Sequence, residues 1–357
     1  MPHKITWGLL GPGRIAGKFI NDLLFAADPS RPTTIEHKLV GIASNSNVKN
    51  AIRFKNDIIN QESNTEIQCY GKYDDLLAND QIQVVYIATP NFNHFELCYK
   101  CLQAGKSVLM EKPFTINAKQ TEILIELSRK KKLFLMEAFW TRFNPIYKDV
   151  YKLCFEESAI GEVVTITSQL SFLFDQSDPS MDRIYNPALG GGVLLDIGIY
   201  ALSWPVGLLN HDRTLEFPEI SSQATLSNTG VDVNTAVVLK YGSNKIGIAN
   251  CSAFYENQNN HVVIYGTEGR IEVDLSYKPT HYWLYDGAGK LVKEKNTNQY
   301  GNGMYFEADH VGECLTKGLI ESDWYTLEDT LTMAKILETV RKQNNVVYPG
   351  KIESTEI

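Results

Sequence analysis

The sequence lacks the features of secreted proteins, of membrane-embedded proteins and of proteins stabilised by structural metal ions. It has six cysteines among 357 residues, no apolar run near membrane-spanning length and no evident low-complexity segment. Its one close cysteine pair, Cys98 and Cys101, lies in a helical pattern without a second Cys or His pair at zinc spacing. We therefore interpret the cysteines as free thiols in a reducing compartment and expect no metal site.

An excess of positive charge is also missing. The chain has 34 Lys and Arg residues against 42 Asp and Glu residues, which gives a net charge of -8. This balance argues against nucleic-acid or membrane-surface binding as the main task. The segment 1–4 leads directly into a strand pattern rather than a signal peptide, so we expect a cytoplasmic protein.

A length of 357 residues exceeds the size at which one core stops growing, so two domains are expected. In residues 1–137, short apolar runs alternate with helical patterns, which predicts a parallel sheet with right-handed crossovers, a Rossmann domain. The expected strands are 5–10, 38–43, 84–88, 107–110 and 133–136, with 67–70 weaker. The expected helices are 14–24, 48–56, 93–104 and 117–131, and 28–34 is read as a loop.

Residues 138–357 show a different sequence pattern. Segments typical of β-strands are joined by short segments typical of turns. They predict an α+β domain with a large open, mainly antiparallel sheet. The expected strands are 161–174, 233–241, 245–254, 261–265, 270–275 and 281–285, and a closing helix is expected at 327–341. With helices on one face only, this sheet would leave an apolar face uncovered, which predicts a homodimer.

A glycine-rich turn follows the first expected strand and opens a helix. Its first glycine permits a tight turn, its second lets the backbone approach a pyrophosphate, and the helix N-terminus presents unpaired N–H groups to the anion. The alternative is a tight turn without a ligand. The residues expected to bind the dinucleotide here are Gly11, Gly13, Arg14, Ile15 and Ala16.

No acidic residue follows the second expected strand. An NAD site usually offers an acid there for the ribose hydroxyls, whereas this chain has Ser44 and Asn45. These polar groups can hydrogen-bond a 2′-phosphate without repelling it, and Lys49 or Arg53 could add positive charge. NADP is therefore favoured, with NAD as the alternative.

The strand at 107–110 ends in a charged pair, Glu111 and Lys112, and is stopped by Pro113. In an open parallel sheet, ligands bind beyond the carboxyl ends of the strands, where an ammonium beside a carboxylate can have an unusual pKa. The alternative is a surface ion pair. We predict that Lys112 is catalytic.

Two further segments carry candidate site residues. After the fourth strand, Thr89, Pro90 and Asn91 could meet the nicotinamide ribose, and His94 could face the ring or simply cap or pack against the next helix. In the second domain, a flexible glycine run opens a helix on which Asp196 and Tyr200, four residues apart, share one face. A neighbouring lysine would lower the pKa of Tyr200 toward a value useful for proton transfer.

At these motifs the chain resembles the glucose-fructose oxidoreductase, inositol dehydrogenase and rhizopine-catabolism (Gfo/Idh/MocA) family from end to end. The stretches 136–143, 194–200 and 303–311 are similar to its branch of dimeric trans-dihydrodiol dehydrogenases and NADP-dependent D-xylose 1-dehydrogenases. The resemblance implies hydride transfer on a sugar, polyol or diol, with Lys112 and Tyr200 at the reacting carbon. The chain departs from that branch at Asn45 or Ser46, where an arginine often holds the 2′-phosphate.

The resulting hypothesis is an NADP-preferring dehydrogenase or reductase acting on CH-OH groups. Tyr200 would take the hydroxyl proton, Lys112 would stabilise the alkoxide, and Asp196 would orient the substrate or Lys112. Further cofactor contacts are expected from Glu111, Lys112, Trp140 and Arg142. Aromatic walls for the substrate are expected from Trp140, Phe143, Phe172, Phe174 and Tyr185, although each alone is more typical of a core.

Two other functions remain open at this level. A cofactor-sensing regulator would need the dinucleotide site but no proton-transfer group, so the presence of Lys112, Asp196 and Tyr200 argues against it. A redox-assisted glycoside hydrolase would keep its NAD bound and regenerate it in each turnover. Release of reduced cofactor into solution would distinguish a dehydrogenase from both.

Overall fold

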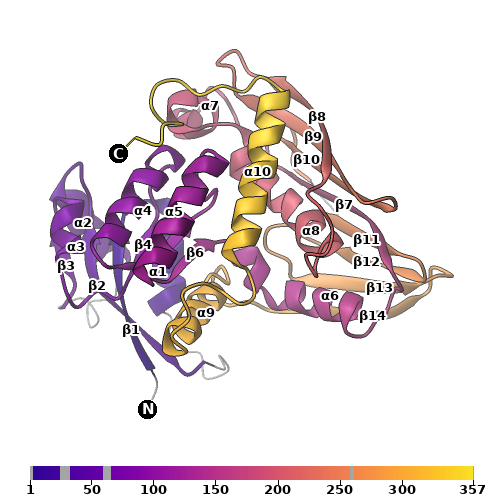
Figure 1. Cartoon of the computed structure of the whole chain (residues 1–357), viewed down its shortest axis with the longest axis horizontal. Coiled ribbons are helices and arrows are strands. Elements are labelled where there is room, and N and C mark those ends of the chain that lie inside the picture. Colours follow the sequence, from indigo (N-terminus) through magenta and orange to yellow (C-terminus); the bar gives the residue numbers. More distant parts are fainter. Residues whose placement is uncertain (1–2, 25–32, 59–65, 258–260, 357) are drawn as a thin grey trace.

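A computed structural model gives the arrangement of residues 3–24, 33–58, 66–257 and 261–356. The molecule contains two sheets that lie beside one another, with helices around the first and between the two (Figure 1). Most of the loop expected at 28–34 lies outside the described residues. The predicted fold class, a Rossmann domain followed by a mainly antiparallel α+β domain, is confirmed.

The first sheet has six parallel strands in the order β3-β2-β1-β4-β5-β6. All six predicted strands are present, including the weak one at β3. The central strands are continuous apolar runs because helices cover both of their faces. The strands are β1 (His3–Leu10), β2 (Ile35–Ala43), β3 (Gln68–Tyr70), β4 (Val84–Ile87), β5 (Ser107–Glu111) and β6 (Leu135–Ala138).

The helices of this half follow the predicted crossovers, with one short addition, α3, which the sequence did not reveal. Helix α5 begins where the Asn117 side chain accepts a hydrogen bond from the Gln120 N–H, and it ends at Lys132, which adopts a left-handed conformation with φ of 56°. The helices are α1 (Arg14–Leu24), α2 (Val48–Ile58), α3 (Tyr73–Leu77), α4 (His94–Gln103) and α5 (Ala118–Lys131).

The second sheet has eight strands in the order β14-β13-β12-β11-β7-β10-β9-β8, and only the central pair β7 and β10 is parallel. The strands are β7 (Val163–Ser171), β8 (Glu219–Leu226), β9 (Asp232–Tyr241), β10 (Lys245–Ser252), β11 (Val262–Gly266), β12 (Gly269–Val273), β13 (His281–Asp286) and β14 (Leu291–Asn296). The sequence missed β8 and β14. Both are edge strands with weak apolar alternation, and every residue of β14 is exposed.

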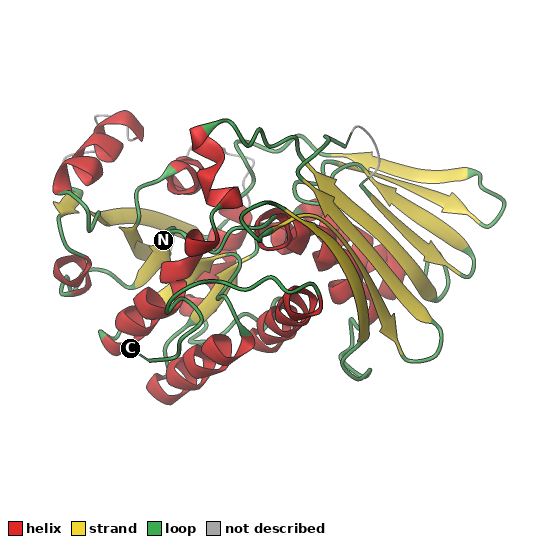
Figure 2. Cartoon of the chain, turned by 90° about the horizontal axis from the view of Figure 1, so that it is seen from above, coloured by secondary structure: helices red, strands yellow, loops and turns green. Residues whose placement is uncertain are grey.

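Helices cover one face of the second sheet and leave the other open (Figure 2). Helix α8 packs on β7 and β10, so closely that a side chain at Gly247 would lie 2.5 Å from Pro205. The remaining helices are α6 (Pro145–Phe155), α7 (Asp182–Tyr185), α8 (Ile199–Leu209), α9 (Tyr305–Thr316) and α10 (Leu327–Gln343). The helix after the glycine run (α8) and the closing helix (α10) were predicted, whereas α6, α7 and α9 were not.

The helical stretch Pro187–Leu209 is long and apolar enough to cross a membrane by length and composition. The expectation that no run reaches this length was therefore wrong. Most of the stretch is buried within the fold, between the second sheet and its neighbouring helices. A fully buried helix is apolar all round for the same reason as a membrane span, because no face meets water. Its burial identifies this stretch, which ends in α8, as part of the core.

The last part of the chain packs back on the first sheet. Helix α10 lies along α5 (Figure 1), where Glu338 accepts a 2.9 Å hydrogen bond from the N–H of Ala118. The guanidinium of Arg341 donates to the carbonyl of Ile116 at 2.9 Å. Helix α10 is therefore part of the packing around the first sheet.

The open face of the second sheet carries exposed apolar side chains. Along β9, buried and exposed residues alternate, and its exposed set includes Val238, which is 38% exposed. The neighbouring Ile248 of β10 is 39% exposed, and Tyr265 of β11 is 42% exposed. Strand pleating sends alternate side chains to opposite faces, so these residues point away from the covering helices.

Candidate active site

The glycine-rich turn lies between β1 and α1, as predicted. Gly11 has a φ of +86°, and a side chain there would lie 2.8 Å from Thr89 and 3.1 Å from the Ala88 carbonyl group. Gly13, in contrast, has no atom within 4 Å of an added side chain, so its backbone faces open space. Helix α1 begins at Arg14, which aims the first N–H groups, including those of Ile15 and Ala16, into this space. The turn therefore fits a pyrophosphate.

Hydroxyl and amide groups cluster at the end of β2, where the acid is missing. The Ser44 hydroxyl lies 3.2 Å from that of Ser46, which accepts a 3.0 Å hydrogen bond from the side-chain amide of Asn50. Asn45 is exposed beside them. These groups carry no negative charge, so they suit a 2′-phosphate as well as a ribose hydroxyl.

The loop after β4 lies beside the glycine-rich turn. Its residues Thr89, Pro90 and Asn91 differ in burial and in their hydrogen bonds. The buried hydroxyl of Thr89 has no partner among the described residues. Asn91 donates a 3.3 Å hydrogen bond to the carbonyl of Gly190 in the second domain. Pro90 precedes the short 3₁₀ helix Asn91–Asn93 and is exposed. An unpartnered buried hydroxyl beside the glycine-rich turn is an additional sign of a missing ligand.

His94 does not point into the cleft. Its ring is fully buried, with Nδ1 2.8 Å from the Pro113 carbonyl and Nε2 2.9 Å from the Thr89 carbonyl. Burial lowers the pKa of His94. His94 therefore packs between the loops after β4 and β5 and contacts both. Of the two roles that the sequence allowed for His94, facing the nicotinamide ring or packing, the structure shows packing.

Lys112 follows β5 and reaches across to the second domain. Its Nζ donates a 2.5 Å hydrogen bond to the carbonyl of Asp196 and lies 3.8 Å from Oδ1 of the same residue. Burial lowers the pKa of Lys112, although the charges of Asp196 and Glu111 act in the opposite direction. Glu111 accepts a 2.5 Å hydrogen bond from the Tyr86 hydroxyl. Lys112 is thus fixed by groups from both halves of the chain.

The glycine run before Asp196 is tightly packed rather than flexible, which corrects the expectation. Gly190 and Gly192 have φ of +70° and +112°, and a side chain at Gly191 would lie 2.6 Å from a backbone carbonyl oxygen. The Asp232 carboxylate accepts a 2.7 Å hydrogen bond from the N–H of Leu194, where a π-helical turn, Leu194–Gly198, begins. This turn carries Asp196 into the cleft.

Tyr200 lies on α8, one turn beyond Asp196, with the Nζ of Lys112 4.8 Å from its ring centre. The indole N–H of Trp140 donates a 2.8 Å hydrogen bond to its hydroxyl oxygen. Burial and the charge of Glu111 raise the pKa of Tyr200 well above its usual value, while the Trp140 N–H opposes this rise. The expected lowering of the Tyr200 pKa is not found, because burial and the charge of Glu111 outweigh the effects that lower it.

An aromatic wall flanks Tyr200. Tyr277, which the sequence did not single out, lies at its centre, with ring centres 6.2 Å from both Trp140 and Tyr200 and 5.7 Å from Phe172. Phe174 packs beside Phe172 at 6.0 Å. Tyr277 comes from an irregular segment after β12, so no strand or helix pattern marked it.

Three other predicted residues have different surroundings. Phe143 is buried and packs on His310, with ring centres 4.9 Å apart. The guanidinium of Arg142 lies over the rings of Tyr147 and Tyr325, at 4.8 and 5.3 Å from the ring centres. These contacts turn Arg142 toward α6 rather than toward Lys112. Tyr185 donates its hydroxyl to the carbonyl of Phe174 at 2.7 Å, which places it behind the wall.

Arg183 on α7 is a site residue that the sequence did not reveal. Its two terminal nitrogens lie 2.6 and 3.3 Å from the two carboxylate oxygens of Asp196. Burial favours the neutral form of Asp196, but the charges of Lys112 and Arg183 outweigh it and lower the pKa of this carboxyl. Arg183 is 13 residues from Asp196 along the chain and its side chain is exposed, so neither spacing nor hydrophobic pattern could have identified it.

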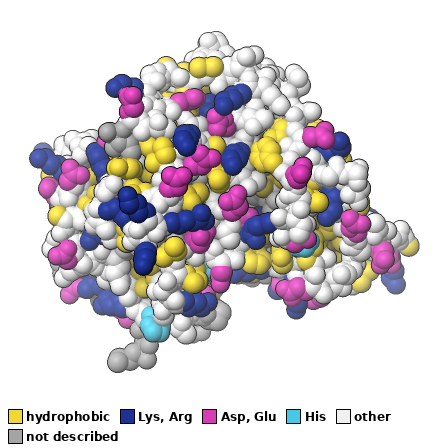
Figure 3. Space-filling view, viewed as in Figure 1, with side chains coloured by type: hydrophobic (Ala, Val, Ile, Leu, Met, Phe, Trp, Pro, Cys, Tyr) yellow, Lys and Arg dark blue, Asp and Glu magenta, His cyan; other side chains and the backbone are white. Residues whose placement is uncertain are grey.

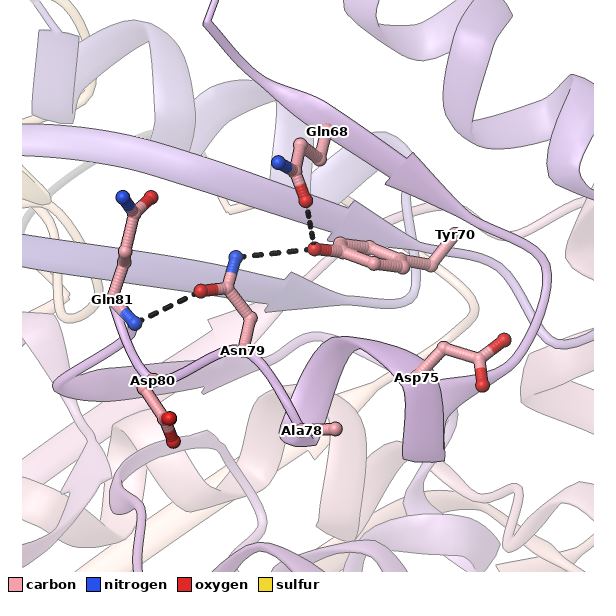
Figure 4. A pocket seen from close by; sticks show the side chains of 7 residues that line it. All are labelled: Gln68, Tyr70, Asp75, Ala78, Asn79, Asp80 and Gln81. Carbon is pink, nitrogen blue, oxygen red and sulfur yellow. Dashed lines mark hydrogen bonds between the residues drawn. The ribbon is translucent and has the colours of Figure 1, made fainter.

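A hollow of about 410 Å³ at the edge of the first sheet is a separate feature (Figure 4). Three of its polar side chains pair with one another, because the Tyr70 hydroxyl donates to Gln68 and accepts a 3.1 Å hydrogen bond from Asn79. Asn79 and Gln81 precede β4, at the opposite end from the glycine-rich turn. On the face drawn in Figure 3, positive and negative side chains are interspersed, without one dominant patch.

The fold, the glycine-rich turn and the paired lysine and tyrosine define a nicotinamide-dependent oxidoreductase. Comparison with known families agrees: residues 5–139 match the model of the oxidoreductase family with an NAD-binding Rossmann fold, and residues 151–272 match the GFO/IDH/MocA C-terminal domain. The chain belongs to the Gfo/Idh/MocA family, as its motifs predicted.

Characterised relatives match over nearly their whole length. The chain is 31% identical to D-xylose 1-dehydrogenase (NADP(+)) of Hypocrea jecorina, covering 98% of this chain and 95% of that one. It is 32% identical to trans-1,2-dihydrobenzene-1,2-diol dehydrogenase of Sus scrofa, covering 97% and 98%. A solved structure of KijD10, a 3-ketoreductase from Actinomadura kijaniata in complex with NADP, has a similar fold with a TM-score of 0.76 at 23% identity, covering 96% and 98%.

Proposed function

We propose that the protein is an NADP-preferring dehydrogenase or reductase that interconverts CH-OH and carbonyl groups of a sugar, polyol or trans-dihydrodiol. The observation that carries this proposal is the meeting of Lys112, Asp196 and Tyr200 at the carboxyl end of β5. These residues come from both halves of the chain and lie close enough to the glycine-rich turn for the charge of Arg14 to act on Asp196. A regulator that only senses the cofactor has no use for such a group.

The residues suited to the dinucleotide are Gly11, Gly13, Arg14, Ile15 and Ala16 for the pyrophosphate, Ser44 and Asn45 for the adenosine ribose, and Thr89 and Asn91 for the nicotinamide side. The bound cofactor would supply the hydride acceptor or donor. The preference for NADP is supported by the absence of an acid beside Ser44 and by the similarity to an NADP-dependent xylose dehydrogenase.

Proton transfer would fall to Tyr200 and Lys112. Because the Trp140 N–H occupies a lone pair of the Tyr200 oxygen, the hydroxyl proton of Tyr200 points elsewhere and can be donated to a carbonyl oxygen. The reverse reaction would return the proton to Tyr200. The ammonium of Lys112 would stabilise negative charge on the reacting oxygen, and Asp196 would fix both Lys112 and a substrate hydroxyl.

The aromatic wall of Trp140, Phe172 and Tyr277 would hold the substrate. Aromatic faces pack against the C–H surfaces of sugars and against aromatic diols, so the wall suits both substrate classes of the relatives. The substrate of the enzyme would therefore be a small neutral molecule. We also propose a homodimer that covers the exposed apolar face around Val238 and Ile248.

The deciding experiment is an absorbance screen for reduced cofactor with NADP and NAD against pentoses, hexoses, inositols and a trans-dihydrodiol. Release of NADPH with at least one of these substrates, lost in Lys112→Met, is the expected result. Cofactor binding without turnover across the panel would favour the regulator. A glycoside is included in the panel, and its cleavage without release of reduced cofactor would favour the redox-assisted hydrolase.

A further inference from the structure

A second cluster of polar side chains lies between α9 and the loop that follows it. His310 and Cys314 are four residues apart on α9 and share one face of the helix, which Asp323 approaches from the loop. Nε2 of His310 is 3.4 Å from Sγ of Cys314 and 3.6 Å from Oδ1 of Asp323. The three ligand atoms all lie within 4.8 Å of one another.

The two distances from Nε2 of His310, to Cys314 and to Asp323, match the spacing of metal ligands. A tetrahedral zinc ion at its usual bond lengths places neighbouring nitrogen, sulfur and oxygen ligands roughly 3.3–3.7 Å apart. Imidazole, thiolate and carboxylate are together typical of zinc rather than of magnesium or calcium, which take oxygen ligands. We propose that His310, Cys314 and Asp323 bind a divalent cation of the zinc class, at a site separate from the hydride-transfer centre.

The surroundings suit an ion that enters from solvent. Cys314 is buried and the His310 side chain is 11% exposed, whereas that of Asp323 is 62% exposed. The charges of Asp323, Lys148 and Lys317 all act on the His310 imidazole. With three protein ligands, a fourth position is left for water. Binding replaces the thiol proton of Cys314, which leaves to solvent.

Metal binding would also displace an existing hydrogen bond. The Ser322 hydroxyl accepts hydrogen bonds from the N–H groups of Trp324 and Tyr325, so its own proton goes to Nε2 of His310, 2.7 Å away. The same loop reaches the active-site half of the fold, because Tyr325 donates to Glu137 and Trp324 donates to the carbonyl of Arg142. A bound ion would tie α9 to this loop and stabilise it.

The test uses untagged protein that has been stripped of metal with a chelator and then titrated with cobalt(II) chloride. We expect one equivalent to bind with a thiolate-to-cobalt absorption band, and zinc to displace it. Cys314→Ser should abolish the band, and Asp323→Asn should weaken binding about tenfold or more. Cys154→Ser, which removes a buried thiol outside the cluster, should leave the band unchanged.

Lys148→Met should tighten cobalt binding, because it removes a positive charge near the site. This effect is opposite to that of Asp323→Asn, which should weaken binding. The Lys148→Met variant separates metal ligation from a purely structural role of the cluster. Absence of the band at one equivalent, or its persistence in Cys314→Ser, would overturn the proposal. If Cys314→Ser fails to fold, the exposed Asp323→Asn decides. Neither readout involves the dinucleotide, so the outcome is independent of the proposed hydride transfer.

Discussion

The indole N–H of Trp140 donates a hydrogen bond to the Tyr200 hydroxyl at 2.8 Å, and so orients the group proposed to transfer the proton. Trp140→Phe removes this donor and keeps an aromatic ring. Loss of one buried hydrogen bond is worth about 1–2 kcal/mol, which predicts a fall in turnover of roughly fivefold to thirtyfold.

The same variant should change the pH profile of substrate oxidation. The Trp140 N–H lowers the pKa of Tyr200, so its removal raises that pKa and moves the ascending limb of the rate to higher pH. Steady-state rates across pH would show this shift. Tyr277→Phe is the control, because it alters the same wall without touching the Tyr200 hydroxyl; an equal shift there would contradict the argument.

Lys112 and Tyr200 should behave as one unit. Lys112→Met and Tyr200→Phe should each lower turnover by roughly a hundredfold to ten-thousandfold, the range of general acid-base groups. The double variant should lose far less than the product of the two, because groups that act together are not additive. Cofactor binding, followed by fluorescence, should survive Tyr200→Phe. Near-normal turnover of that variant would assign proton transfer to Lys112 or Asp196.

Cofactor choice should depend on the end of β2. A carboxylate introduced by Ser44→Asp would repel a 2′-phosphate and could bind ribose hydroxyls instead. We expect the unmodified protein to bind NADP more tightly than NAD, and the variant to reverse this order. Titration of each protein with both cofactors provides its own control. Equal or tighter binding of NAD by the unmodified protein would refute the preference.

Arg183 should set the acidic limit of activity. It helps to lower the pKa of Asp196, and a lowered carboxyl pKa keeps the charged form, with its stabilising contacts, until the pH falls through that value. Arg183→Gln should raise this pKa and move the acidic limb of kcat/KM to higher pH. Arg213→Gln is a matched control, because Arg213 forms an equally close 2.6 Å pair with Asp329, an acid that the proposal does not involve. A shift in the control but not in Arg183→Gln would refute the prediction.

Assembly should depend on the open face of the second sheet. Light scattering of the 40.2 kDa chain should give twice that mass at micromolar concentration. Ile248→Asp should shift the mass to that of a monomer, since it places a charge in the proposed interface. Ile52→Asp, at an equally exposed apolar residue on α2, should leave the dimer intact. A monomer in the unmodified protein would exclude the interface.

The sequence predicted the parts of this site that depend on local chain direction. Lys112 was identified because a strand ends there, and the dinucleotide turn because a strand, two glycines and a helix follow one another. Asp196 and Tyr200 were identified by their spacing and by resemblance to a family. These features are encoded within a few residues of one another.

The sequence could not predict contacts made across the fold. Arg183 comes from the four-residue helix α7 and Tyr277 from an irregular segment, so no periodicity pointed to their contacts with Asp196 and Tyr200. Arg142 lies in the stretch 136–143, which resembles the family and led us to expect a cofactor contact. Its guanidinium instead packs against Tyr147 and Tyr325. The pKa of Tyr200 also escaped prediction, because it depends on burial and on the nearby charge of Glu111, which comes from the other half of the chain. The edge strand β14 was missed because it has no buried side chain.

The packing of α10 on α5 has a consequence for synthesis of the chain on the ribosome. Glu338 and Ala118, which join these helices, are 220 residues apart. At about 5–20 residues per second, α5 waits roughly 10–45 seconds for its covering helix. During that interval Leu124 lacks Leu327, which shares its core cluster, and the nascent first domain exposes apolar surface. Chains released early at a stop codon before α10 should therefore be substrates for chaperones and proteases.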